Sequence, residues 1–281
     1  MENSPVAKAG VMGWPVGHSL SPRLHGYWLQ HYHIAGTYEA LPVPPSELAS
    51  TLKGLPKQGL RGVNLTVPHK EAACALVDHL DSAAKHIGAV NLVVVDAQGQ
   101  LHGRNTDAYG FMQNLMTSGY HSKGGAVFII GAGGAARAAI VGLLHMGVGE
   151  IRLTNRTPER AEKLAHEFST PTCKITAIPW EKAASTLGEV ELLVNTTSLG
   201  MTGQPSLTFS LDALPEAAMV NDIVYVPLET DLLRQARRRG HQTIDGLGML
   251  LHQARPSFEA FFGRDPEVTE ELRRFVLMGK E

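Results

Sequence analysis

The chain has little of several features that mark particular protein classes. Of its 281 residues only two are cysteines, Cys74 and Cys173, which lie far apart and form no CxxC pair. A disulfide framework and a structural zinc site are therefore not expected. The 13 histidines are scattered and include no HExxH pattern, so no metal site is expected either.

Long apolar runs and net charge are also scarce. No run approaches the roughly 18 apolar residues of a membrane-spanning helix, and the first ten residues lack a secretory signal. The formal charge is only −2, which removes the attraction to phosphates that a nucleic-acid binder needs. With 43% hydrophobic residues the chain can bury a large core. We expect a folded cytoplasmic protein with no nucleic-acid or membrane partner.

What the chain does contain is glycine, 29 residues in all, and a regular alternation of short β-type runs with amphipathic stretches. That alternation predicts βαβ units, an α/β fold and mostly parallel sheets. Two helices, 248–262 and 266–278, are expected to end the chain and to pack back on its first half. The expected strands are 10–14, 37–41, 61–66, 89–95, 126–130, 151–154, 174–178, 191–195, 219–224 and 242–244.

A glycine-rich turn follows the apolar strand 126–130 and leads into a helix. A turn of this kind permits close approach of backbone to a pyrophosphate, which the helix N-terminus then faces with free N–H groups. Small side chains at the start of the helix keep it close to the sheet. The sequence thus predicts a dinucleotide site. Its residues are Gly131, Ala132, Gly133, Gly134 and Ala135.

The next strand, 151–154, indicates which dinucleotide binds. Sites for NAD place an acidic residue at this strand end, where it accepts a hydrogen bond from the ribose 2′-hydroxyl. Here the strand is followed by Asn155, Arg156 and Thr157, with Arg160 shortly after. Because Arg156 can pair with a 2′-phosphate, the cofactor is predicted to be NADP, although the alternative is that Arg156 and Arg160 are only solvated surface residues. Thr157 is predicted to cap the next helix, with a proline at its first position.

Polar clusters in the first half follow other strands. Ser21 suits the cap position of a helix that starts with Pro22, which leaves Ser19 free to help hold a carboxylate. After strand 61–66, Pro68 predicts a helix start that would place Lys70 in the first turn. A lysine there opposes the helix dipole, which suits proton transfer, although a solvated surface lysine is the alternative.

Two more polar residues stand beside predicted strands of the first half. Asp107 is either a simple helix cap or a partner that sets the protonation of Lys70. Asn91, at a strand edge, needs hydrogen-bond partners when buried, and a substrate hydroxyl is one candidate. In the second half, the strand ends 195–198 and 222–227 and the helix start at 246–249 collect similar residues, for which purely structural roles remain open.

Taken together, these segments resemble the shikimate dehydrogenase family. The motifs follow the order of that family across nearly the whole chain. They are GWPVGHSLSP (13–22), NLTVPHK (64–70), GAVN (88–91), GRNTD (103–107), GAGGAAR (131–137), NRTPER (155–160), NTTSLGM (195–201) and DGLGMLLHQA (245–254).

The resemblance implies a fold, a reaction and roles for particular residues. The fold would combine a discontinuous substrate domain (1–107 and 246–281) with a Rossmann-like NADP domain (108–245), with a cleft between them. The reaction would be NADPH-dependent reduction of 3-dehydroshikimate to shikimate, with Lys70 and Asp107 as the catalytic pair. Ser19 and Ser21 would hold the carboxylate. The other substrate contacts would be Thr66, Asn91, Tyr225 and Gln253, and Ile223 and Gly246 would lie near the nicotinamide.

Two alternatives stay open beside this interpretation. One is a quinate/shikimate dehydrogenase with broader substrate or cofactor use, and the other is a non-catalytic NADP-binding regulator on the same scaffold. Both Lys70 and Asp107 are present, which argues against the regulator. The sequence has no heptad seam, so a monomer and a homodimer are equally compatible with it.

Overall fold

Contacts within the chain divide the protein into two compact units. The structure, a computed structural model, describes residues 6–278. Unit 1 comprises the chain up to Thr106 together with the residues from Leu250 onward, and unit 2 comprises Asp107–Met249. No helix within residues 6–278 is long and apolar enough to cross a lipid bilayer.

Unit 1 is built on a six-stranded mixed sheet with the order β2-β1-β3-β5-β6-β4. β5 runs against its neighbours β3 and β6, and the other pairings are parallel. The strands are β1 (Ala7–Gly13), β2 (Gly36–Pro42), β3 (Leu60–Leu65), β4 (His79–Leu80), β5 (Leu92–Val95) and β6 (Leu101–Arg104). One core of this unit lies between the sheet and α2, and its buried members include Leu52, Val63 and Val93.

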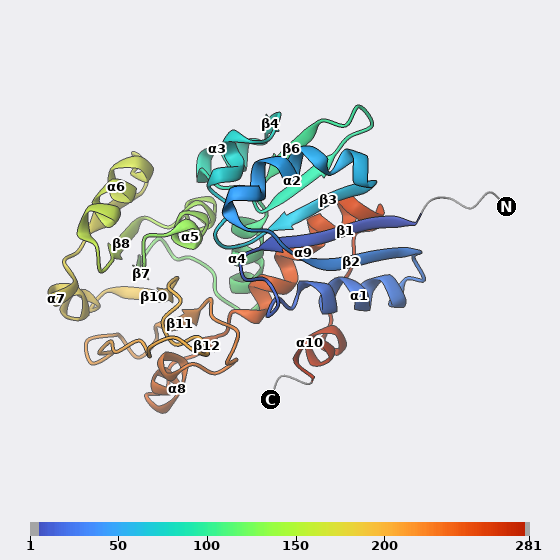
Figure 1. The fold of residues 1–281 in the computed structure, drawn as a ribbon. Coiled ribbons are helices and arrows are strands. Elements are labelled where there is room, and N and C mark those ends of the chain that lie inside the picture. Colours follow the sequence, from blue (N-terminus) through green and yellow to red (C-terminus); the bar gives the residue numbers. More distant parts are fainter. Residues whose placement is uncertain (1–5, 279–281) are drawn as a thin grey trace. The chain divides into compact units, whose positions relative to one another are not determined.

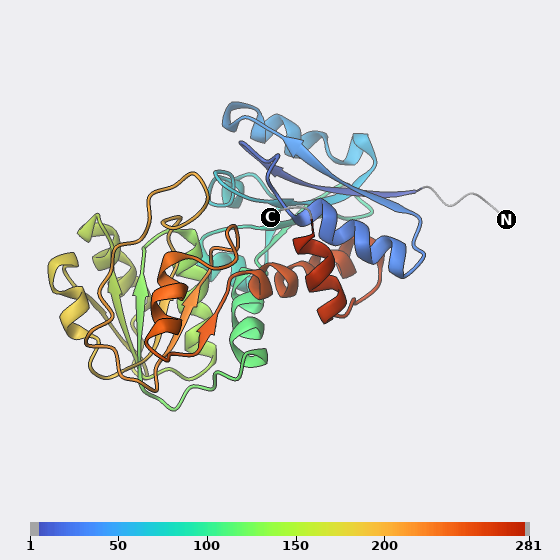
Figure 2. The same ribbon diagram turned by 90° about the horizontal axis from the view of Figure 1, so that it is seen from below.

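The helices of unit 1 include the end of the chain. Trp28 of α1 donates a hydrogen bond from Nε1 to the carbonyl of Glu267 (3.0 Å), and Arg23 Nε donates to the carbonyl of Phe275 (2.7 Å). The C-terminal segment therefore packs against α1, as the sequence predicted, and α10 lies beside α1 in both views (Figures 1 and 2). The helices are α1 (Ser21–His31), α2 (Leu48–Gly54), α3 (Ser82–Ile87), α10 (Glu270–Leu277) and α9 (Leu247–Phe262), which starts in unit 2.

Unit 2 is a six-stranded parallel sheet with the order β12-β11-β10-β7-β8-β9. Its strands are β7 (Ala126–Ile130), β8 (Glu150–Thr154), β9 (Lys174–Ala177), β10 (Val190–Asn195), β11 (Met219–Asp222) and β12 (Thr243–Ile244). The helices are α4 (Asp107–Thr117), α5 (Gly134–His145), α6 (Pro158–Phe168), α7 (Trp180–Ala183) and α8 (Asp231–Arg238). α5 and α6 lie on one face of the sheet and α8 on the other (Figure 1). The order is that of a Rossmann sheet, whose direction of winding reverses between β7 and β10.

Several sequence expectations about local structure were wrong. The two short strands β4 and β6 were not among the ten expected, because neither contains a β-branched residue or a Phe, Tyr or Trp that would mark it as a strand. The last helix begins at Glu270 rather than at 266, since the Thr269 hydroxyl accepts from the amide of Leu272 and caps it there. No helix starts at Pro68, as described below.

The apolar strand β7 forms the centre of unit 2. All five of its residues are buried, and Phe128 packs in a cluster with Leu193, Phe209 and Val220. Strands buried on both faces in this way are typical of parallel sheets covered by helices. The stability of the unit therefore depends on close packing around β7.

Phe128→Ala should lower the free energy of unfolding by about 3–5 kcal/mol, because it leaves a cavity at a fully buried position. Urea denaturation followed by far-UV circular dichroism measures this change. Met116→Ala is the matched control, since Met116 is 42% exposed on α4 of the same unit and its loss should cost less than about 1 kcal/mol. Equal losses for the two variants would contradict the assignment of the core.

Candidate active site

Four segments of unit 1 meet at one edge of its sheet. Three of these segments follow the carboxyl ends of β1, β3 and β6. The fourth precedes β5, which runs in the opposite direction and therefore begins at the same edge. Backbone bonds join them: Thr66 N donates to Met12 O (2.9 Å), and Leu65 N donates to Asn91 O (2.9 Å). The sheet thus brings together segments that the sequence singled out separately.

The serine pair after β1 has a different local role from the one expected. α1 begins at Ser21 itself, and Leu20 occupies the cap position. Instead the Ser19 hydroxyl accepts from the amide of Ser21 (3.3 Å), so the expectation that Ser21 caps the helix was wrong, while a carboxylate held by the two hydroxyls stays a prediction. The reason is that Ser19 stands two residues before the free amide, which is the spacing of a local hydroxyl–backbone turn. Ser21 is buried and Ser19 is half-buried.

Lys70 lies in a turn after β3 and not in a helix. The nearest helical segment is a 3₁₀ turn at Ala72–Ala75. Ring atom Nε2 of the buried His69 lies 2.8 Å from the carbonyl of Val43, and the carbonyl of Lys70 accepts from Val90 N (2.8 Å). These tertiary bonds hold the segment in a turn, so the expected opposition between Lys70 and a helix dipole is absent. The Lys70 side chain is half-buried at the polar edge.

Asn91 and Gln253 lie side by side, although 162 residues separate them. Asn91 Nδ2 donates to Gln253 Oε1 (3.2 Å) and to Thr106 Oγ1 (2.9 Å), while Asn91 Oδ1 accepts from Thr106 N (2.8 Å). The Thr106 hydroxyl also donates to the carbonyl of Gln253 (2.9 Å). Thr106 was not among the predicted site residues; its place between Arg104 and Asp107 was the only signal for it.

In unit 2 the predicted cofactor residues follow the carboxyl ends of neighbouring strands. Gly131 follows β7 with φ of 112°, and a Cβ there would lie 2.6 Å from Thr196 Oγ1. Thr196 in turn follows β10, and its hydroxyl donates to the carbonyl of Ile130 (2.8 Å). Glycine at 131 is therefore required both by backbone conformation and by the close approach of the neighbouring loop.

Gly133 is different, because the fold does not require a glycine there. Its backbone is extended (φ −98°, ψ −169°), and a Cβ would meet no protein atom within 4 Å. The first turn of α5, which follows it, contains no acidic residue. Open space, free N–H groups and the positive end of a helix together suit a pyrophosphate. The residues present therefore fit a dinucleotide of the predicted kind.

The loop after β8 and the first turn of α6 each expose one arginine. Thr157 occupies the cap position of α6 as predicted, but its side chain makes no capping bond, and Pro158 begins the helix. Asn155 Nδ2 donates to the carbonyl of Thr157 (2.9 Å), which closes the loop. Arg156 and Arg160 are exposed. No carboxylate occupies the end of β8, so the loop suits a ligand with an added phosphate.

A buried carboxylate organises the ends of β10 and β11. Asp222 is fully buried and accepts from Thr230 Oγ1 (2.7 Å), Val224 N (3.0 Å) and Asn195 Nδ2 (3.0 Å). Burial disfavours the charged form and raises the pKa of Asp222 to about 6, although the three hydrogen bonds act in the opposite direction. Asp222 was seen in the sequence only as part of a strand end.

The remaining predicted residues of unit 2 lie beside this network. Ile223 donates its backbone N–H to the carbonyl of Asn195 (3.1 Å), and Tyr225 follows two residues later, half-buried. Gly246 is required by packing, because a Cβ there would lie 2.1 Å from the carbonyl oxygen of Ile223. Asp107 is the buried first residue of α4 and also the first residue of unit 2.

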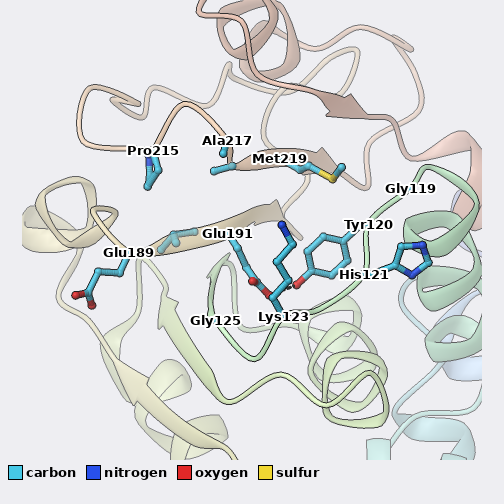
Figure 3. A pocket seen from close by; sticks show the side chains of 12 residues that line it. Gly119, Tyr120, His121, Lys123, Gly125, Glu189, Glu191, Pro215, Ala217 and Met219 are labelled. Atoms are coloured by element: carbon cyan, nitrogen blue, oxygen red, sulfur yellow. Dashed lines mark hydrogen bonds between the residues drawn. The ribbon is translucent and has the colours of Figure 1, made fainter.

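A pocket of about 330 Å³ lies at the opposite edge of the same sheet, where β7, β10 and β11 begin (Figure 3). Tyr120, Lys123 and Glu191 project into it, and the Tyr120 hydroxyl donates to Glu191 Oε1 (2.7 Å). Burial raises the pKa of Tyr120. None of its lining residues belongs to the predicted site, because the nucleotide loops follow the other ends of the strands.

The fold and the polar edges define a class of protein. A Rossmann sheet with an open glycine turn, joined to a separate α/β unit that carries a lysine among amide and hydroxyl groups, is the arrangement of a dinucleotide-dependent dehydrogenase. Within residues 6–278 no group of three or more His, Cys, Asp or Glu side chains could hold a metal ion.

Comparison with known proteins narrows the class to a family. Residues 11–93 match the model of the shikimate dehydrogenase substrate-binding domain, 115–226 that of shikimate / quinate 5-dehydrogenase, and 246–270 that of the shikimate 5′-dehydrogenase C-terminal domain. The chain is 55% identical over 271 residues to the shikimate dehydrogenase (NADP(+)) of Paramagnetospirillum magneticum, covering 96% of this chain and 97% of that one. The chain belongs to the shikimate dehydrogenase family.

Solved structures agree with this assignment. Shikimate 5-dehydrogenase from Thermus thermophilus, in complex with NADP(H) and shikimate, is 38% identical with a TM-score of 0.85, covering 96% of this chain and 99% of that one. Quinate dehydrogenase from Corynebacterium glutamicum, in complex with NAD, is 29% identical with a TM-score of 0.89, covering 96% and 98%. The fold is thus shared by enzymes whose names differ in substrate and cofactor.

The pKa of Asp222 predicts a pH dependence of stability. The folded-state pKa of about 6 exceeds the usual value of 3.8, so the folded state binds more protons between these values. The protonated Asp222 side chain therefore stabilises the fold fully below about pH 4, and this contribution is lost as the pH rises through 6. Relative to Asp222→Asn, the wild type should lose about 3 kcal/mol of unfolding free energy between pH 4 and 7. Urea denaturation at a series of pH values measures this.

Asp212→Asn is the control for this series. Its carboxyl is exposed and has a lowered pKa, owing first to the Ser210 hydroxyl and then to Arg239, so any trend should have the opposite sign. A difference between wild type and Asp222→Asn that stays constant from pH 4 to 7 would contradict the raised pKa.

Proposed function

We propose that this protein catalyses the reversible, NADPH-dependent reduction of 3-dehydroshikimate to shikimate, a step of aromatic amino acid biosynthesis that takes place in the cytoplasm. The observation that carries the proposal is the polar edge of unit 1, where Asn91, Thr106 and Gln253 interlock beside the segment of Lys70. It occurs in a chain 55% identical to an NADP(+) shikimate dehydrogenase. A ring with several hydroxyls and a carboxylate is a substrate that such an edge can recognise.

Two domains take separate parts in the proposed reaction, and their proposed borders differ slightly from those of the compact units. The domain formed by 1–107 and 246–281 binds the substrate, and the domain 108–245 binds NADP. In the first, Ser19 and Ser21 hold the carboxylate. Thr66, Asn91, Gln253 and, from the other domain, Tyr225 contact the ring and its hydroxyls.

NADPH supplies the hydride when it is bound. Its pyrophosphate is held by the turn and helix start at 131–135, and its 2′-phosphate by the loop 155–160, where Arg156 forms the main charge pair. Ile223 and Gly246 lie toward its nicotinamide. The open space beside Gly133 supports this placement, because nothing in the protein itself requires a glycine there.

Lys70 donates a hydrogen bond to the carbonyl oxygen of the substrate and provides the proton that this oxygen gains. Asp107 accepts from the lysine ammonium and keeps it oriented, and it also binds a substrate hydroxyl. In the reverse direction Lys70 receives the proton from the alcohol. A positioned acid–base group of this kind contributes roughly 10²–10⁴-fold to the rate.

Steady-state assays with shikimate and with quinate, each with NADP+ and with NAD+, test the proposed function. Shikimate with NADP+ should give the highest kcat/KM, and Lys70→Ala should lower kcat by two or more orders of magnitude with little change in the Kd for shikimate. The control is Lys85→Ala, an exposed lysine on α3 of the same unit. Preference for quinate would favour the broader dehydrogenase, and NADPH binding without turnover would favour the regulator.

Arg156→Ala tests the cofactor assignment. Because the guanidinium pairs with the 2′-phosphate, its loss should raise KM for NADP+ by about 10- to 100-fold and leave KM for NAD+ nearly unchanged. Arg238→Ala, an exposed arginine on α8, is the control and should change neither value. A similar rise in KM for both cofactors would show that Arg156 does not bind the 2′-phosphate.

A further inference from the structure

A buried amide at the end of β3 connects several parts of unit 1. Asn64 Nδ2 donates to the carbonyl of Asn91 (3.0 Å) and to the hydroxyl of Ser257 (2.8 Å), while its Oδ1 accepts from the Tyr38 hydroxyl (2.8 Å). These three partners determine the orientation of the amide, since the reversed orientation would place two oxygens together. Asn64, Tyr38 and Ser257 are all buried, so the bonds are shielded from water.

The Tyr38 side chain reaches the amide from β2 and is itself held in place. Its ring stacks face to face on the ring of His25, with centroids 3.8 Å apart and planes 2° from parallel. Burial lowers the pKa of His25 to about 3, so the imidazole is neutral and acts as an apolar platform. The phenol is thus held in one direction, toward Asn64.

The same aromatic pair connects Tyr38 to the helix that carries one of the predicted substrate contacts. Ser21 lies four residues before His25 on α1, so hydroxyl and imidazole share one face of that helix. Burial raises the pKa of Tyr38, so its hydroxyl stays protonated and donates to Asn64. By stacking on His25, Tyr38 therefore holds α1, and with it Ser21, in place relative to the sheet.

The Nδ2 atom of Asn64 binds two further segments, each of which carries a predicted substrate contact. It holds the backbone of Asn91 directly. It also holds Ser257 on α9, which lies one helical turn after Gln253 and on the same face. One amide and one phenol thus connect the three segments that carry Ser21, Asn91 and Gln253.

We propose that Tyr38 and Asn64 are positioning residues, which set the spacing of Ser21, Asn91 and Gln253 for the carboxylate and hydroxyls of the substrate. The proposal rests on the proposed function. Substrate recognition by several hydrogen bonds requires groups held within about 0.5 Å of their places, and a buried network provides that rigidity. Losing the network should therefore weaken substrate binding and leave the nucleotide unit and the proton transfer largely unaffected.

Tyr38→Phe tests the proposal, because it removes only the hydroxyl and keeps the ring on His25. We expect KM for shikimate, and its Kd from calorimetry, to rise about tenfold, with kcat and KM for NADP+ changing less than about twofold. The matched control is Tyr32→Phe, since the Tyr32 hydroxyl makes a hydrogen bond of its own in unit 1, which it accepts from Glu267 N (3.0 Å). That variant should lose a similar amount of stability with no change in KM.

A double-mutant cycle separates positioning from a general loss of stability. If Tyr38 acts through the Asn64 amide, which also holds Ser257, adding Tyr38→Phe to Ser257→Ala should raise KM for shikimate by much less than tenfold. Ser257→Ala, which reaches Gln253 by the other branch, should raise KM by itself, and it replaces the test if Tyr38→Phe fails to fold. Independent effects in the cycle, or equal effects of Tyr38→Phe and Tyr32→Phe on KM, would overturn the proposal. Failure of the wild type to oxidise shikimate would instead refute the proposed function.

Discussion

A polar side chain buried inside a protein must find its hydrogen-bond partners there, and this requirement shapes both units. In unit 1 the amide of Asn64 is hydrogen-bonded to a phenol, a carbonyl and a hydroxyl from three other segments. In unit 2 the carboxylate of Asp222 accepts hydrogen bonds from a hydroxyl, a side-chain amide and a backbone N–H. Each group stands at or next to the carboxyl end of a strand that has a neighbour on both sides. The geometry of the polar edges therefore depends on these two satisfied groups, because the loops that carry the candidate functional residues are tied to them.

The glycines of unit 2 show how packing and ligand binding can be told apart. Gly131 and Gly246 lack room for a side chain, because Thr196 in one case and Ile223 in the other approach the backbone closely. Gly133 has ordinary extended dihedrals and open space around it. Packing therefore requires a glycine at 131 and 246 but not at 133, where the open space is compatible with a ligand approaching the backbone.

Sequence reasoning worked best where a pattern reports a local physical preference. β7 was predicted with the correct limits because an uninterrupted apolar run followed by a glycine turn has few alternatives. It failed for Lys70, where Pro68 suggested a helix start but contacts of His69 and Val90 hold the segment in a turn. It also failed for the capping of α1, because both Ser19 and Ser21 suit such a role and only the folded backbone distinguishes them. β6 was missed because its four residues include no β-branched residue and no Phe, Tyr or Trp.

For the candidate site, too, the sequence predicts local features, whereas contacts between distant segments appear only in the folded structure. Motif order and spacing, which reflect the local chemistry of turns, helix starts and strand ends, were sufficient to indicate a dinucleotide fold, the choice of NADP and the family. The sequence by itself also determined which side chains are available at each strand end. Only the tertiary structure decided how they are connected, because Tyr38, Asn64, Thr106 and Ser257 acquire their partners through contacts between segments up to 193 residues apart. Such contacts depend on how strands pair and helices pack, and neither is encoded in a short stretch of chain.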